Sequence, residues 1–161
     1  MKPKHLVRRH FTIANCMDDL SYKAYINAIK QFLDGEKIEK NELDSVIKRE
    51  EPGTFTLTVK NYWAKKGLSM RLCDDYQDRI FEVQGPMGKG LDIQPDGTHI
   101  AFSAGTGCLV FVDLVAHLVR KNLGLLSADE EAQVGDKFKL VMFMSFPKKE
   151  DAIAYDLCAG L

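Results

Sequence analysis

The chain has 161 residues, of which 45% are hydrophobic and 28% charged, so it can bury a core of useful size and has ordinary globular composition. Its 22 basic and 23 acidic residues give a net charge of −1, which argues against a general nucleic-acid binder with a basic excess. The four cysteines are far apart and form no C-x-x-C pair, so a zinc site is not expected and reduced thiols are favoured.

The first half of the chain combines alternating patterns with one strong helical pattern. Asp18 and Asp19 are good caps for a helix that carries apolar residues at helical spacing and ends at Gly35. Residues 34–51 are rich in mixed charge and predict a solvated insertion with a short helix near residues 43–47. The other expected elements are strands at residues 7–14, 55–60 and 80–84 and a short helix at residues 66–72.

The pattern changes after Gly85, where short apolar runs replace alternation. Residues 99–104 form one such run, and residues 108–122 then predict a buried helix that ends at Gly124. Residues 139–146 are almost continuously apolar, which is typical of a parallel strand covered on both faces. With a further helix expected at residues 150–160, the order strand, helix, strand, helix predicts an α/β layer.

Two glycine-rich turns are candidate ligand sites. Gly105-Thr106-Gly107 lies between an expected strand and an expected helix, where backbone N–H groups and the positive helix end bind phosphate readily. Gly85-Pro86-Met87-Gly88 begins a tight loop with exposed donors. Each turn has a plain alternative interpretation, because glycines also serve the geometry of α/β connections and inter-domain turns.

The segment Arg9-His10-Phe11-Thr12 is a third candidate site. On a strand, Arg9 and Phe11 point to one side and Thr12 to the other. A guanidinium can bind a phosphate with two nitrogens, and an aromatic ring can cover a flat heterocycle. The alternative is an ordinary alternating strand with one aromatic residue in the core.

Asp113 and His117 lie four residues apart on the helix expected at residues 108–122. That spacing places both side chains on one helix face, where they could pair. A metal site is the other interpretation of these two residues. No arrangement of nucleophile, base and acid can be recognised elsewhere in the sequence.

The order of these motifs resembles that of the ferredoxin–NADP reductase superfamily, which includes the ferric reductases and NADPH oxidases. The resemblance extends from residue 9 to residue 107, and the strand at residues 139–146 continues it. The motifs are Arg9-His10-Phe11-Thr12-Ile13-Ala14, Leu57-Thr58-Val59-Lys60, Gly67-Leu68-Ser69, Gly85-Pro86-Met87-Gly88 and Ala104-Gly105-Thr106-Gly107.

The resemblance implies a role for each of these residues. Arg9 would bind the flavin pyrophosphate, Phe11 would stack on the flavin ring, and Thr12 would hydrogen-bond its reactive edge. Gly67 and Ser69 would complete the pyrophosphate site at a helix N-terminus. The residues expected on the pyridine-nucleotide side are Gly85, Pro86, Gly88, Gly105, Thr106 and Gly107.

The fold implied is α/β, or α+β when the whole chain is considered. Residues 1–84 would form part of an antiparallel flavin-binding barrel with a helical insertion at about residues 16–52, and residues 85–161 part of a Rossmann-like NAD(P)-binding domain. A further chain or domain would supply the remaining parts of both. With no signal peptide or membrane span expected, the protein is predicted to be cytoplasmic or at the cytoplasmic face of a membrane complex.

The implied activity is an FAD-dependent oxidoreductase that takes a hydride from NAD(P)H and passes electrons to an acceptor. The cofactors would be FAD and NAD(P)H, and no nucleic-acid partner is expected. The alternative is a non-catalytic subunit or interaction module that reuses part of the reductase scaffold. A third interpretation is an NAD(P)-binding module without flavin.

Overall fold

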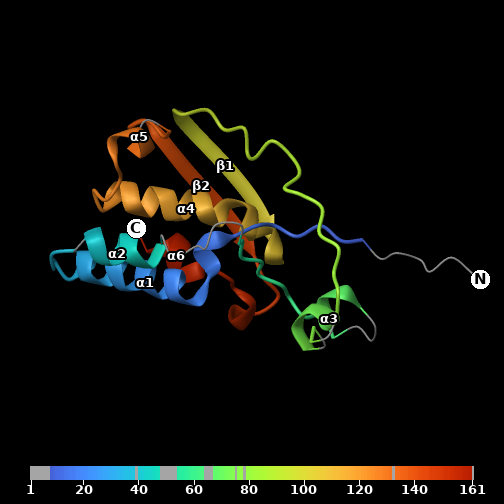
Figure 1. The fold of residues 1–161 in the computed structure, drawn as a ribbon. Coiled ribbons are helices and arrows are strands. Elements are labelled where there is room, and N and C mark those ends of the chain that lie inside the picture. The colour runs from blue at the N-terminus through green and yellow to red at the C-terminus, as the bar shows by residue number, and fades with distance from the viewer. Residues whose placement is uncertain are drawn as a thin grey trace, which may run out of the picture.

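The computed structural model of the chain describes residues 8–38, 40–47, 54–63, 67–74, 76–77, 79–131 and 133–160. It is a mixed α/β structure in which helices pack on one face of a two-stranded parallel sheet (Figure 1). The elements are η1 (Asn15–Met17), α1 (Asp19–Leu33), α2 (Lys40–Ile47), α3 (Leu68–Asp74), β1 (Gly97–Ala104), η2 (Gly105–Cys108), α4 (Leu109–Asn122), α5 (Ala128–Glu131), β2 (Phe138–Ser145), η3 (Lys149–Asp151) and α6 (Tyr155–Ala159).

The β1–η2–α4–β2 segment forms a parallel crossover unit. The two strands pair in register from Gly97 opposite Phe138 to Ala104 opposite Ser145. Both strands therefore end at the same edge of the sheet, and η2 leads from that edge directly into α4 (Figure 1). The predicted α/β layer is confirmed to this extent, including the apolar strand and the long helix before it.

Local sequence signals account for α1. The side chain of Asp18 accepts a hydrogen bond from the backbone N–H of Ser21 at 3.0 Å, which caps the first turn. Gly35 follows the helix with φ of +73°, a conformation that favours glycine and ends the helix cleanly. The buried face of α1 carries Tyr25 and Ile29 toward α4 and α6.

One hydrophobic core joins α1 with α4 and α6. It includes Ala14, Tyr25 and Ile29 from the first part of the chain and Val112 and Leu157 from the last. Val112 is fully buried and Leu157 is 1% exposed, so these side chains are central to the packing. The core therefore combines residues from both sides of Gly85.

The strands expected before Gly85 do not form, and among the described residues no antiparallel barrel is present. The segments at residues 8–14 and 54–63 meet in a single antiparallel bridge between Ile13 and Leu57. Residues 80–84 belong to no strand or helix, and Ile80 is 97% exposed. Alternation indicates a half-buried face, but a strand also needs a neighbouring ladder of hydrogen bonds, which these segments lack.

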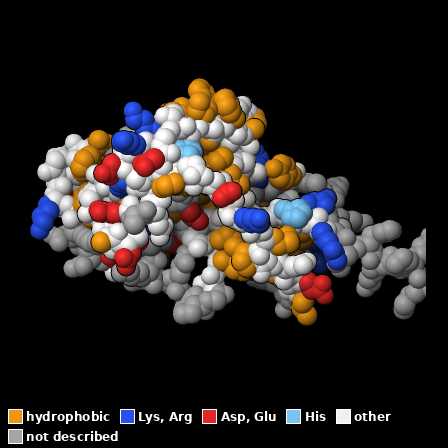
Figure 2. Space-filling view, turned by 90° about the horizontal axis from the view of Figure 1, so that it is seen from above, with side chains coloured by type: hydrophobic (Ala, Val, Ile, Leu, Met, Phe, Trp, Pro, Cys, Tyr) orange, Lys and Arg blue, Asp and Glu red, His pale blue; other side chains and the backbone are white. Residues whose placement is uncertain are grey.

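Among the described residues the helices cover one face of the sheet, which corrects the prediction of a strand buried on both faces. On the outer face Ile100 is 60% exposed, Phe102 76%, Val141 42% and Phe143 54%. The Phe102 and Phe143 rings stack with their centroids 5.0 Å apart. Figure 2 shows hydrophobic side chains gathered at the surface of the molecule. We call Ile100, Phe102, Val141 and Phe143 the outer face.

The chain after β2 is less regular than expected. The helix predicted at residues 150–160 is divided into η3 and the short α6. Between them, Ala154 has φ of +58°, which a continuous right-handed helix cannot contain. Ala154 is nonetheless buried in the core, so the break places α6 against α1 and α4.

Candidate functional site

The turn after β1 offers open backbone at the end of a parallel strand. Gly105 has φ of +52°, in the region that favours glycine. A Cβ built on Gly105 or on Gly107 would meet no heavy atom within 4 Å. A ligand can therefore approach the backbone of this turn closely from the side where a Cβ would project.

The electrostatic setting of this turn favours an anion. The N-terminal end of α4 carries a partial positive charge from its aligned peptide dipoles. Neither η2 nor α4 has an acidic residue in its first turn, and Arg120 and Lys121 lie at the opposite end of α4. Residues 148–151, which follow β2 at the same edge of the sheet, carry two basic and two acidic side chains and so add no net charge. This edge therefore suits phosphate or carboxylate.

The residues expected to hold a flavin lie on separate segments. Arg9 is exposed, and its Nη1 donates a hydrogen bond to the carbonyl of Arg8 at 2.7 Å. Phe11 and Thr12 are half-buried. Gly67 and Ser69 are half-buried at the start of α3, which lies to one side of the sheet and its helices (Figure 1).

The second glycine turn is an exposed loop. Gly85, Pro86 and Gly88 are all exposed, and Gly88 has φ of +96°. The loop lies in the long connection from α3 to the start of β1 (Figure 1). Of the residues proposed for nucleotide binding, the structure brings Gly105, Thr106 and Gly107 together at the edge of the sheet and leaves Gly85, Pro86 and Gly88 on this separate connection.

Asp113 has a structural connection that the sequence interpretation missed. Its Oδ1 accepts a hydrogen bond from the backbone N–H of Cys16 at 3.0 Å, and its Oδ2 accepts one from Asn15 at 3.2 Å. The side-chain oxygen of Asn15 in turn accepts a hydrogen bond from the N–H of Thr56 at 3.2 Å. These bonds tie α4 to the two segments that meet at the Ile13–Leu57 bridge.

The expected pair of Asp113 and His117 is thus replaced by contacts with distant backbone. The Nε2 of His117 is buried without a hydrogen-bond partner in the described part of the chain. Burial also lowers the pKa of His117. An acidic residue one turn inside an apolar helix was the only signal in the sequence for the contacts of Asp113.

The cysteine at the end of the turn is a core residue. Cys108 is fully buried, and its Sγ donates to the carbonyl of Ile153 at 3.8 Å. Burial raises the pKa of Cys108 and, with the nearby Asp113 carboxylate, that of Cys16. Burial also raises the pKa of Cys158 to about 11. These thiols are therefore poor nucleophiles near neutral pH.

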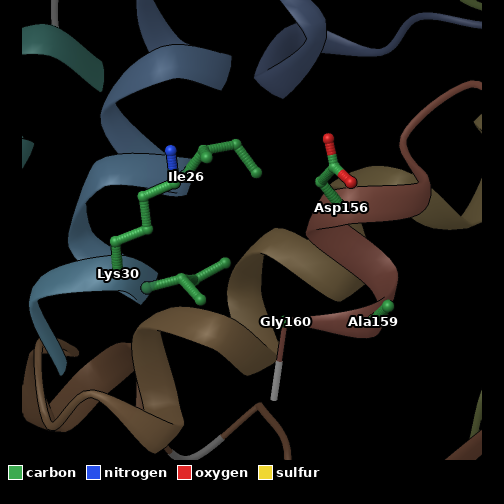
Figure 3. A pocket seen from close by; sticks show the side chains of 6 residues that line it. Ile26, Lys30, Asp156, Ala159 and Gly160 are labelled. Carbon is green, nitrogen blue, oxygen red and sulfur yellow. The ribbon is translucent and has the colours of Figure 1, made fainter. Parts of the chain in front are cut away.

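Two pockets lie away from the glycine turn. One has a volume of about 360 Å³ between α1 and α6, with Lys30 and Asp156 on its two walls (Figure 3). The other has a volume of about 280 Å³ between α4 and β2, and its lining includes Leu118 and Met144. Neither pocket contains a residue that the sequence proposed for cofactor binding.

The described residues contain no cluster of three or more His, Cys, Asp or Glu side chains that could hold a metal ion. None of the helices in the same part of the chain has the length and apolar content needed to cross a membrane. Comparisons with family models, curated proteins and solved structures find no match to this chain.

Proposed function

We propose that the chain binds a pyridine nucleotide at Gly105–Gly107 and acts in an FAD-dependent oxidoreductase that takes a hydride from NAD(P)H and passes electrons to an acceptor. The observation that supports this best is the β1–η2–α4–β2 unit, with its open glycine turn at the carboxyl end of the strands. Ligands of parallel α/β sheets bind at this edge, where strand ends and helix N-termini meet. The choice of cofactors comes from the resemblance of the motif order to the ferredoxin–NADP reductase superfamily.

The turn fits the pyrophosphate of a dinucleotide. Backbone N–H groups of Thr106 and Gly107 would donate to phosphate oxygens, and the N-terminal end of α4 would stabilise their negative charge. The absence of side-chain atoms on Gly105 and Gly107 leaves room for that approach.

The flavin side of the proposal depends on Arg9, Phe11 and Thr12. The exposed guanidinium of Arg9 is accessible to a pyrophosphate, and Phe11 and Thr12 each keep part of their surface accessible. These residues lie outside the pockets at α1–α6 and α4–β2, and a further domain or chain would complete the flavin site. A bound flavin would supply the redox chemistry, and the residues of this chain would bind and orient it.

An absorbance spectrum of the purified chain, before and after incubation with FAD, tests the proposal. We expect flavin bands that remain after removal of free FAD and are bleached by NADPH in the absence of oxygen. A folded chain that stays colourless with excess FAD would overturn the flavin assignment. Calorimetric titration with NADP⁺ would then show whether the turn binds a nucleotide alone.

Arg9→Ala is the residue-specific test, with Arg8→Ala as the matched control. Arg8 is also exposed and carries the same charge one position earlier, outside the proposed site. A hydrogen bond to a charged phosphate contributes about 1.5–3 kcal/mol, so Arg9→Ala should weaken FAD binding by roughly ten- to a hundredfold. Arg8→Ala should change it by less than about threefold. Equal effects of the two substitutions would contradict the role of Arg9.

The second candidate function is an interaction module without catalysis, and the outer face favours it. Ile100, Phe102, Val141 and Phe143 form an exposed apolar surface of the kind that another polypeptide covers. A chain that binds no FAD or NADP⁺ but associates through this face would support the second function over the first.

A further inference from the structure

The hydrogen bonds of Asp113 connect the two halves of the proposed cofactor site. Asp113 lies six residues after Gly107, which along a helix is a separation of about 9 Å. Asn15 lies three residues after Thr12, so Thr12 is at most about 10 Å along the chain from the point where Asp113 binds. The nucleotide turn and the Arg9–Thr12 segment are therefore attached to the same carboxylate by short lengths of chain.

Both oxygens of this carboxylate accept hydrogen bonds from the segment that contains Asn15 and Cys16. Oδ1 accepts from Cys16 at 3.0 Å and Oδ2 accepts from Asn15 at 3.2 Å, so the segment is held at two consecutive peptide groups. Two such bonds restrict the direction of the chain as well as its position. The side-chain oxygen of Asn15 accepts a hydrogen bond from the Thr56 N–H at 3.2 Å, which links the same segment to Thr56.

We propose that Asp113 is a positioning residue that fixes the Arg9–Thr12 segment relative to the Gly105–Gly107 turn; this inference rests on the proposed function. Asp113 aligns the donor and acceptor of the hydride without touching either of them. Hydride transfer requires close, well-aligned groups, so a small displacement of one segment lowers its rate strongly.

The hydrogen bonds of Asp113 can set the direction of the segment around Asn15, because burial of neighbouring residues already holds that segment in place. Ala14 is fully buried and Cys16 is 7% exposed, and both belong to the core. Asp113 is exposed and lies outside that core, so its removal leaves no cavity. Loss of the carboxylate should therefore loosen the direction of the segment while the core remains packed.

Amide hydrogen exchange, followed by NMR on the parent chain and on Asp113→Asn, tests the contact without any cofactor. Asparagine keeps the size of the side chain but presents an NH₂ group to one of the two backbone donors. We expect exchange at Asn15 and Cys16 to accelerate by about tenfold or more, with the central amides of α4 unchanged. The control is Asp129→Asn, an exposed acid in α5, which should leave these amides unaffected.

The functional arm measures FAD affinity, NADP⁺ affinity and the rate of flavin reduction by NADPH in stopped flow. Asp113→Asn should slow reduction by about tenfold or more while each affinity changes by less than about threefold. If exchange at Asn15 and Cys16 is unchanged, or if reduction proceeds at the parent rate, the inference is overturned. If the parent chain binds neither nucleotide, the proposed function fails, and the positioning role fails with it. If the parent binds both nucleotides and Asp113→Asn reduces flavin at the parent rate, only the role of Asp113 is overturned.

Discussion

Substitution of Gly107 by alanine separates ligand binding at the turn from its structural role. Gly107 is exposed, and a Cβ placed on it meets no heavy atom within 4 Å. Its φ lies outside the left-handed region, so alanine can adopt the same backbone. Gly107→Ala should therefore stabilise the folded chain by about 0.4–1 kcal/mol, because alanine restricts the unfolded chain more than glycine does.

The same methyl group should impair nucleotide binding. It would occupy the open space over the backbone, from which a phosphate would approach the N–H groups of Thr106 and Gly107. Loss of one hydrogen bond to a charged phosphate costs about 1.5–3 kcal/mol, which corresponds to roughly ten- to a hundredfold weaker NADP⁺ binding. The variant is thus expected to be more stable and to bind more weakly.

Urea unfolding and calorimetric titration with NADP⁺ measure the two effects separately. Gly105→Ala is the informative comparison, since φ of +52° at Gly105 should cost alanine about 1–2 kcal/mol of stability. Its loss of affinity would therefore be accompanied by a loss of stability, unlike that of Gly107→Ala. Parent-like NADP⁺ affinity in Gly107→Ala would refute the assignment of this turn as a phosphate site.

Two further predictions concern a carboxylate and the outer face. Hydrogen bonds from the Ser127 N–H, the Arg120 guanidinium and the Ser127 hydroxyl hold the pKa of Glu130 at about 2, below its ordinary 4.5. The ionised form therefore stabilises the fold above about pH 4.5, and this contribution is lost as the pH falls toward 2. Urea unfolding should show Glu130→Gln to be less stable than the parent by about 1 kcal/mol at pH 7. The effect is modest because 33% of the Glu130 side chain is exposed, and the difference should disappear near pH 2. A stability difference that does not depend on pH would contradict this. Phe102→Ser should lower the unfolding free energy by no more than about 1 kcal/mol, because the residue is 76% exposed and loses mainly its stacking on Phe143, and should reduce any self-association seen in sedimentation. A stability loss comparable with that of Val112→Ala, about 2 kcal/mol, would show that the outer face is covered.

The elements that the sequence predicts well are those with local signals. Asp18 and Gly35 mark the ends of α1 because capping and left-handed geometry depend on a few neighbouring residues. The glycine turn between β1 and α4 is equally local, since an apolar run, a break and a second apolar run occur within about two dozen residues. The parallel pairing of β1 and β2 then follows from the crossover helix between them.

The features that the sequence does not predict depend on distant partners. The segments at residues 55–60 and 80–84 have strand composition, but pairing requires a neighbour that composition cannot specify. A continuous apolar strand likewise does not reveal that Phe102 and Phe143 face outward. The contacts of Asp113 with Asn15 and Cys16 join positions 98 and 97 residues apart, and no spacing rule on a single helix reaches that far.

The bridge between Ile13 and Leu57 gives the helical insertion a closed stem. Ala14 donates to the carbonyl of Thr56 at 3.1 Å, and Thr56 donates to the side chain of Asn15 at 3.2 Å, so the ends of this excursion meet. Lengthening an excursion whose ends already meet costs little extra loop-closure free energy, about 0.6 kcal/mol for each doubling. This segment can therefore accept added residues while the pairing at its base persists. Changes to this segment must keep α1, because its Tyr25 and Ile29 cover α4 and α6. Removal of these side chains would leave apolar surface exposed.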